Sequence, residues 1–215
     1  AALDVPTVLE ISHMGYLTGL LDALHVPAEA RGKILDFLRA KNAHELRTAA
    51  LDAGLDEDAA AALAGLLDLH GVLGATLAKA RAACLCDAQR EALDELQALQ
   101  NALGEDGRGT LLDLSMADEM EYYNGLVFTG YVAGVPRAVL KGGRYDYLMQ
   151  RFTPGANAIG FAMYLDELER LAAPLPPVQQ QGGEKTWLNI ALPKGRLGDK
   201  AYKLLAGAGY SANED

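Results

Sequence analysis

Residues 122–146 read YYNGLVFTGYVAGVPRAVLKGGRYD, and the pattern within this stretch predicts the fold. Two apolar runs, at 126–132 and 137–141, lie on either side of an Ala-Gly-Val-Pro connection at 133–136. β-Branched and aromatic residues on both sides of a turn that contains Gly and Pro are typical of a β-hairpin. We therefore predict two neighbouring antiparallel strands here, and a further strand at 158–163.

The rest of the chain predicts elements that complete an α+β fold. Residues 7–24 predict a strand and then an amphipathic helix, because a β-branched start gives way to apolar residues spaced three and four apart. Residues 27–103 predict a helical insert, 110–115 a buried strand and 165–171 a terminal helix. Breaks between the helices of the insert are expected at three glycines: Gly54, Gly71 and Gly74. The expected architecture is an antiparallel sheet with helices packed on one face.

The composition narrows the classes of protein to which the chain can belong. Its 215 residues are 50% hydrophobic and 22% charged, as in soluble globular proteins. Asp and Glu outnumber Lys and Arg by 29 to 19, and this net charge of −10 argues against binding to nucleic acid. No apolar run reaches the ~18 residues of a membrane-spanning helix, and no secretory signal opens the chain. Since residue 1 is not Met, we expect the chain to begin inside a longer gene product.

Cys84 and Cys86 are the two cysteines of the chain. A single C-x-C pair without further Cys or clustered His is neither a disulfide framework nor a zinc site. We expect two reduced thiols in an Ala-rich helical stretch, which indicates a cytoplasmic protein without a metal site.

Residues 173–186, rich in Pro, Gln and Gly, have the composition of a linker between domains. After it, 187–215 predict a strand, a basic loop and a helix, with four basic side chains against three acidic ones. The formal charge therefore changes from −11 before this unit to +1 within it. We predict that a second domain begins at residue 187, since so short a unit cannot bury a core alone.

Three segments combine aromatic, glycine and charged residues in ways that a strand does not require. One of them, 158–164, has Gly160 inside a strand, where it permits a close approach of the backbone. Tyr122 and Tyr123 sit at a strand entrance, where alternation would send one ring to each face, either to bind a polar ligand or to pack. The glycines at 142–143 permit a close approach of the backbone, and Arg144 and Asp146 add charge. The alternative for the segment that contains these two glycines is a strand-to-helix turn with a structural ion pair.

Together these segments resemble the class II synthetase core of histidyl-tRNA synthetases. That core contains a Tyr-Tyr-x-Gly strand, a Gly-Gly-Arg-Tyr-Asp turn and a final Gly-Phe-Ala strand. The same motifs occur here in the same order, at 122–128, 142–146 and 160–162. The resemblance covers about residues 7–172 and implies a partial class II aminoacyl-tRNA synthetase-like core at 1–172.

The resemblance also implies a pocket for the imidazole of histidine. Tyr123 and Tyr145 would line this pocket, and their neighbours would shape its wall. The implied ligand-binding residues are Tyr122, Tyr123, Gly142, Gly143, Arg144 and Tyr145.

Three positions depart from the synthetase pattern. Asp118 stands where the synthetase carries an Arg that helps to activate the carboxylate of histidine. Tyr164 and Glu167 stand where it carries a Gly that makes room for ATP and an Arg that grips the phosphates. Because an anion cannot clamp a triphosphate, these departures imply a core that has lost adenylate formation.

A synthetase-like core without its ATP grip resembles the regulatory subunit of ATP phosphoribosyltransferase, a paralogue of histidyl-tRNA synthetase. The resemblance implies a noncatalytic protein of histidine biosynthesis that senses histidine as effector and assembles with the catalytic subunit of this glycosyltransferase. The full-length form would be an oligomer. One alternative is a fragment of a histidyl-tRNA synthetase, which activates histidine with ATP. Another is a degenerate core that acts only through protein contacts.

The basic loop Lys194, Gly195 and Arg196 begins a helix, so it is either an anion cradle or a solvated turn. Residues 188–197 resemble the start of the catalytic subunit of ATP phosphoribosyltransferase. This implies a fusion in which the transferase domain begins at 187–215, with the three loop residues as candidates for phosphate binding. No cofactor is expected in this chain, whereas the full transferase would need Mg²⁺.

Overall fold

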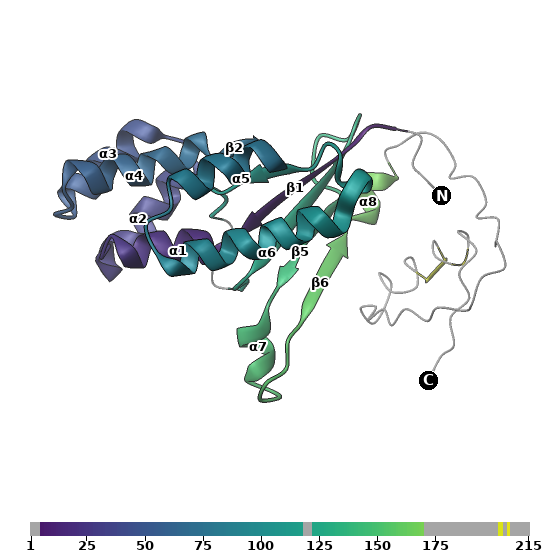
Figure 1. Ribbon diagram of the computed structural model, residues 1–215. Helices are drawn as coiled ribbons and strands as arrows, with labels where there is room; N and C mark the ends of the chain where they lie inside the picture. The colour runs from purple at the N-terminus through teal and green to yellow at the C-terminus, as the bar shows by residue number, and fades with distance from the viewer. Residues whose placement is uncertain (1–4, 118–121, 170–201, 204–205, 207–215) are drawn as a thin grey trace.

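Helices and one mixed sheet make up the part of the chain that the computed structural model describes, residues 5–117, 122–169, 202–203 and 206 (Figure 1). The six strands of the sheet are, in spatial order, β2 His70–Val72, β3 Leu111–Asp113, β1 Thr7–His13, β4 Leu126–Val132, β5 Leu140–Arg144 and β6 Ile159–Met163. Neighbouring strands are antiparallel except for β1 and β3, which run parallel. The predicted α+β fold is confirmed. The sheet is mixed, whereas the sequence predicts an antiparallel one, because the long connection between β1 and β3 allows their parallel pairing.

Apart from a short helix at 146–150, the helices lie within the ranges that the sequence predicts as helical, with further breaks at 40–42 and 83–86. Their bounds are α1 Met14–Ala23, α2 Ala28–Arg39, α3 Ala43–Asp52, α4 Glu57–Gly65, α5 Leu73–Ala82, α6 Asp87–Leu103, α7 Asp146–Gln150 and α8 Leu165–Leu168, with 3-10 turns η1 Leu66–Asp68 and η2 Gly104–Gly107. The side chains of Asn42 and Asp56 cap α3 and α4 by accepting the N–H groups of Glu45 at 3.2 Å and Ala59 at 2.8 Å. Each such cap stabilises its helix by about 1 kcal/mol.

Two details of the helical insert differ from the prediction. His70–Val72 is a short strand, because its backbone pairs with β3 at the edge of the sheet. Gly74 lies in the first turn of α5 and does not separate two helices. This strand could not be predicted from the sequence, because three residues are too few to show an alternation of apolar and polar side chains.

The strand predicted at 137–141 is displaced towards the C-terminus and runs over Leu140–Arg144. Val135 and Val139 are buried together with Val132, so the chain between β4 and β5 is a packed loop. As a consequence, the glycines at 142–143 lie within a strand and not in a turn.

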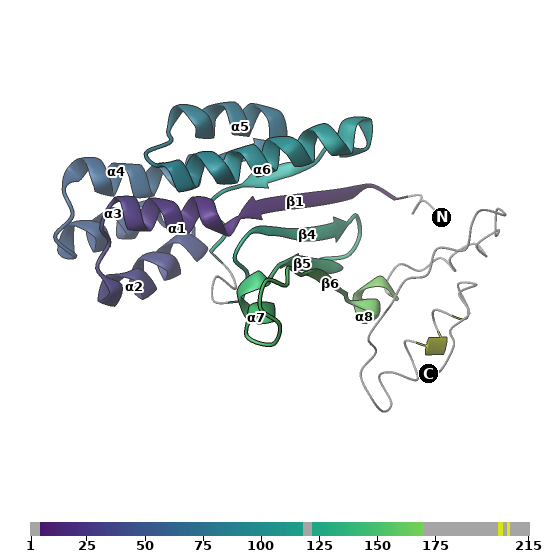
Figure 2. The ribbon, with the colours of Figure 1, turned by 60° about the horizontal axis from the view of Figure 1, so that its bottom comes forward.

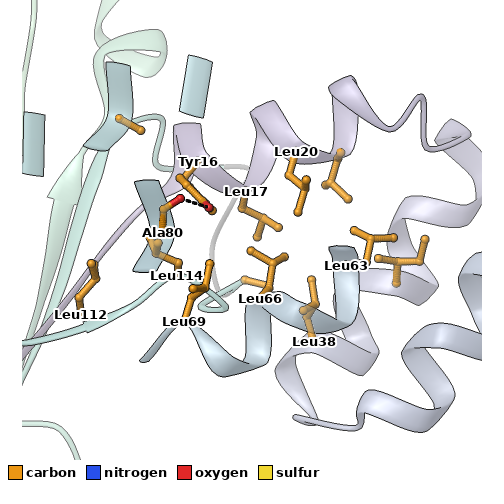
Figure 3. Close-up of a cluster of buried hydrophobic side chains, with 14 of the residues drawn as sticks. Tyr16, Leu17, Leu20, Leu38, Leu63, Leu66, Leu69, Ala80, Leu112 and Leu114 are labelled. Atoms are coloured by element: carbon orange, nitrogen blue, oxygen red, sulfur yellow. Dashed lines mark hydrogen bonds between the residues drawn. The ribbon is translucent and has the colours of Figure 1, made fainter. Parts of the chain in front are cut away.

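The main core lies between the helices and one face of the sheet (Figure 3). Leu38 and Leu63 are fully buried, and so is the ring of Tyr16. The hydroxyl of Tyr16 donates to the carbonyl oxygen of Ala80 at 3.3 Å, as Figure 3 shows. Burial raises the pKa of Tyr16 to about 12, so this donor stays protonated at neutral pH.

The two faces of the sheet differ in what covers them. Ile11 and Phe128 are paired across β1 and β4 and therefore share a face, which packs against the helical core. Figures 1 and 2 both show α6 lying along the sheet. Glu10 and Thr129 are also paired, one position away, so they belong to the opposite face. We call this opposite face the open face.

Both cysteines are free thiols and lie half-buried in the connection between α5 and α6, and not, as predicted, within a helical stretch. Cys84 follows the end of α5, and Cys86 is the residue before α6 begins. None of the helices within the described ranges is both long and apolar enough to cross a bilayer.

His13 is the last residue of β1 and caps the start of α1. Its Nδ1 accepts the N–H of Gly15 at 3.2 Å, so Nε2 carries the ring proton and donates to the carboxylate of Glu95 at 3.2 Å. The ring is buried, and this burial lowers the pKa of His13 in spite of the nearby carboxylate. The neutral ring therefore belongs to the folded state.

We expect acid to destabilise the protein through His13. Because the pKa is lower in the folded state, the stabilisation is complete above the ordinary value of 6.5 and is lost as pH falls below it. Urea unfolding between pH 8 and 5 should show a slope from this group of at most about 1.4 kcal/mol per pH unit. The variant His13→Asn, which can still cap the helix but cannot titrate, should lack this slope. Identical pH profiles for both proteins would contradict the assignment.

Candidate functional site

Three tyrosine rings gather on the open face of the sheet. The Tyr122 ring lies 4.8 Å from that of Tyr123, with an interplanar angle of 89°, and 5.5 Å from that of Tyr145. The expectation that Tyr122 and Tyr123 point to opposite faces is wrong. Both residues precede β4, which begins at Leu126, so strand alternation does not govern them. We call these three rings the tyrosine cluster.

Glycines in β5 and β6 make room for the tyrosine cluster. A Cβ atom on Gly143 would lie 2.7 Å from Cδ1 of Tyr123 and 2.9 Å from the carbonyl oxygen of Leu126. A Cβ atom on Gly160, the partner of Gly143 in the ladder, would lie 3.0 Å from the hydroxyl oxygen of Tyr145. The close approach that the sequence indicates is therefore present, and it brings two aromatic rings onto the backbone of neighbouring strands.

Gly142 makes room for a side chain on the face of the sheet that packs against the helices. A Cβ atom there would lie 2.5 Å from both the carbonyl oxygen of Gly160 and Cζ of Phe128. Phe128 packs against the helical core, so Gly142 lets the core-facing ring approach the backbone of β5 closely.

The guanidinium of Arg144 does not join the tyrosine cluster. Its Nε lies 2.5 Å from Oδ2 of Asp146, and its Nη1 lies 3.0 Å from Oε2 of Glu95 on α6. The structural ion pair between Arg144 and Asp146, which the sequence allowed as an alternative to a ligand-binding role, is thus present. Burial alone would raise the pKa of Asp146, but hydrogen bonds from the N–H of Ala158 and from Arg144 lower it below its usual value.

A shallow polar hollow, which the sequence did not predict, adjoins the tyrosine cluster. Its two parts have volumes of about 30 and 140 Å³ and share Met116, Thr129 and Lys141. The smaller part reaches Tyr123, and the larger part extends over β1 and β3. The residues lining the larger part are Glu10, Arg39, Lys41, Asp113, Ser115, Met116, Thr129, Tyr131 and Lys141. Glu10, a charged residue within an apolar strand, was the one sign of this hollow in the sequence. The other residues that line the hollow come from segments far away in the chain, so the sequence did not reveal them.

Charges in the larger part of the hollow are arranged around Asp113. Lys41 has a left-handed backbone, with φ of 52°, and its Nζ donates to Oδ2 of Asp113 at 2.7 Å and to the hydroxyl of Ser115. Burial opposes the ionisation of Asp113, but these partners outweigh it and lower its pKa. Burial and the nearby Asp113 raise the pKa of Glu10. The charges of Lys41 and Asp113 are therefore paired with each other within the hollow.

Tyr164 and Glu167, the two described positions that depart from the synthetase pattern, lie just after the end of β6. Tyr164 is partly exposed, and its N–H donates to the carbonyl oxygen of Val139 at 2.8 Å. The side chain of Glu167 on α8 is buried, 3.8 Å from the guanidinium of Arg137. An anion in contact with a cation of the protein has no affinity for phosphate.

Some predicted site residues lie outside the described part of the chain. These are Asp118 and the basic loop Lys194, Gly195 and Arg196. Within the described residues, no group of three His, Cys, Asp or Glu side chains could hold a metal ion.

Comparisons with known proteins agree with this geometry. The sequence model of the family described as histidyl-tRNA synthetase matches residues 1–168. The ATP phosphoribosyltransferase regulatory subunit of Burkholderia vietnamiensis is 36% identical over 81% of this chain and 44% of its own length. The solved structure of an ATP phosphoribosyltransferase regulatory subunit/histidyl-tRNA synthetase from Bacillus halodurans is 29% identical, with a TM-score of 0.68, over 78% of this chain and 45% of that one.

The fold is also that of more distant structures. The ATP phosphoribosyl transferase (HisG:HisZ) complex from Thermotoga maritima contains a chain that is 21% identical, with a TM-score of 0.58, over 75% of this chain and 54% of that one. The fold and the tyrosine cluster thus define a class II aminoacyl-tRNA synthetase-like protein. Within that class, the chain belongs to the histidyl-tRNA synthetase family. It spans less than half the length of the curated relatives that it matches.

We expect Gly143→Ala to destabilise the protein by about 1–3 kcal/mol, because the new methyl group would overlap the Tyr123 ring and the Leu126 carbonyl. The matched control is Gly32→Ala in α2, where no heavy atom lies within 4 Å of the new Cβ. This control should leave stability unchanged or raise it by up to ~1 kcal/mol through helix propensity. Urea unfolding measures both, and equal stability of the two variants would contradict the close packing at Gly143.

Proposed function

We propose that the protein acts as the regulatory subunit of ATP phosphoribosyltransferase, the first enzyme of histidine biosynthesis. The observation that carries the proposal is a tyrosine cluster that is retained at one end of β6, while the other end of β6 no longer suits ATP. Tyr164 fills the position of a glycine, and the buried anion Glu167 stands where the resemblance implies a phosphate-gripping arginine. The names of the most similar curated relatives support the same assignment.

In this proposal the tyrosine cluster binds histidine as the effector. Aromatic edges and hydroxyl groups on an open sheet face suit an imidazole ring, which offers both an apolar surface and two polar nitrogens. Tyr123 and Tyr145 contact the ligand, while Tyr122 and the glycines at 142–143 form the wall. Arg144 contributes by holding Asp146 rather than by touching the ligand.

The other candidate function is that of a histidyl-tRNA synthetase, of which this chain would be a fragment. The description of the matching family names this enzyme. Adenylate formation needs cations that neutralise the phosphates in the transition state. Asp118 and Glu167 would both place negative charge where the synthetase pattern has arginine. The regulatory role is therefore the better supported of the two.

The proposed partner is the catalytic subunit of ATP phosphoribosyltransferase, and the assembly is an oligomer. A complex that contains a chain of this fold is known from Thermotoga maritima. In the proposed fusion, 173–186 link the core to a transferase domain that begins at 187–215, and Lys194, Gly195 and Arg196 bind phosphate. The assembled transferase would use Mg²⁺. The gene sequence beyond both ends tests the fusion, which requires a phosphoribosyl pyrophosphate loop downstream.

Histidine should bind the full-length protein in a calorimetric titration. Tyr123→Ala and Tyr145→Ala should weaken this binding tenfold or more, because each removes a contacting ring and a hydroxyl partner. The matched control is Tyr147→Ala on α7, a tyrosine that is 70% exposed and lies outside the tyrosine cluster. Equal affinities of all three variants would refute the pocket.

Histidine-dependent exchange between ATP and pyrophosphate should be absent from the full-length protein. This assay reports adenylate formation directly, and a bona fide histidyl-tRNA synthetase serves as the positive control. Robust exchange would overturn the regulatory assignment and establish the synthetase.

A further inference from the structure

A chain of polar contacts crosses from the helical layer to the segment that carries the tyrosine cluster. It begins at Glu95 on α6, whose Oε2 accepts from Nε2 of His13 at 3.2 Å and from Nη1 of Arg144 at 3.0 Å. His13 belongs to the junction of β1 and α1, and Arg144 is the last residue of β5. One carboxylate oxygen therefore joins three elements that are distant in sequence.

Arg144, which Glu95 holds, is in turn bound to Asp146. Its Nε donates to Oδ2 of Asp146, while Oδ1 of Asp146 accepts the N–H of Ala158 at 2.8 Å. The N–H of Asp146 in turn donates to Oδ1 of Asn124 at 2.7 Å. Asp146 thus connects the chain before β4, the end of β5 and the start of β6.

Two residues of the tyrosine cluster are neighbours in sequence of the residues in these contacts. Tyr145 stands between Arg144 and Asp146, and its N–H donates to the carbonyl oxygen of Ala158 at 2.9 Å. Tyr123 directly precedes Asn124, whose N–H donates to the carbonyl oxygen of Arg144 at 3.0 Å. A shift of the Arg144 guanidinium would consequently move the backbone that carries both rings.

Helix α6, which carries Glu95, is held rigidly in the core. Ala92, Leu93 and Leu96 are fully buried in the main core, so the backbone next to Glu95 cannot move without opening that core. A carboxylate that accepts a guanidinium hydrogen bond forms a stronger contact than an amide would. The half-exposed Glu95 side chain thus anchors Arg144 to a rigid helix.

We propose that Glu95 is a positioning residue of the tyrosine cluster: it acts through Arg144 and Asp146 to hold Tyr145 and Tyr123 in place for the ligand. Its effect on histidine affinity rests on the function proposed above, but its effect on the backbone around Asp146 does not. The two can therefore be measured separately.

The test compares Glu95→Gln with Glu91→Gln in the full-length protein. Glu91 is an exposed residue one turn earlier on α6, so its variant removes the same charge from the same helix. Hydrogen exchange is measured at the amides of Asp146 and Ala158, with the core amide of Leu112 as internal reference. Glu95→Gln should accelerate exchange at Asp146 and Ala158 by about three- to tenfold and leave Leu112 unchanged, whereas Glu91→Gln should change none of them.

A second arm places Glu95→Gln in an Arg144→Gln background. Since Glu95 acts through Arg144, it should have no further effect there on either amide. An undiminished effect, or equal exchange in the Glu95→Gln and Glu91→Gln variants, would overturn the proposal. Calorimetry then measures histidine affinity, which Glu95→Gln should lower by about three- to tenfold. If the unaltered protein binds no histidine, the sensing function fails, while the exchange data still decide the role of Glu95.

Discussion

The approach of three strand backbones at Gly142, Gly143 and Gly160 is the constraint on which the rest of this structure depends. At these positions the strands β4, β5 and β6 leave no space for a Cβ atom on either face. On one face the space is filled by Phe128, which packs against the core, and on the other by the rings of Tyr123 and Tyr145. The same three glycines therefore determine how Phe128 lies against the sheet and where the rings of the candidate site lie.

Ionic contacts then fix the geometry that the glycines permit. The two glycines of β5 have no side chains that could hold an aromatic ring in place. The strand ends in Arg144 and is followed by Asp146, and the charges of these two residues are paired. Through Glu95 this pair is also connected to the helical layer. The tyrosine cluster is thus supported from the back of the sheet, by the face that the ligand would not touch.

The two faces of the sheet carry different kinds of residue. The helix-covered face carries the stability, since most of the buried apolar residues lie there. The open face carries polar groups such as Glu10 and Lys141, together with the tyrosine cluster. Substitutions at Tyr164 and Glu167, near the end of β6, change charge and shape without entering the main core. Function can therefore diverge while the fold is retained.

Local sequence patterns determined most of the elements and the identity of the tyrosine and glycine residues. Caps such as Asn42 and Asp56, and the alternation in β4, act between residues a few positions apart, so they are legible without a structure. Only the tertiary structure decided that Arg144 turns away from the tyrosine cluster, that Glu95 supports it, and that Glu10 lines a hollow with Lys41. These contacts join residues that are tens of positions apart, and no local periodicity records which distant charges the fold brings together.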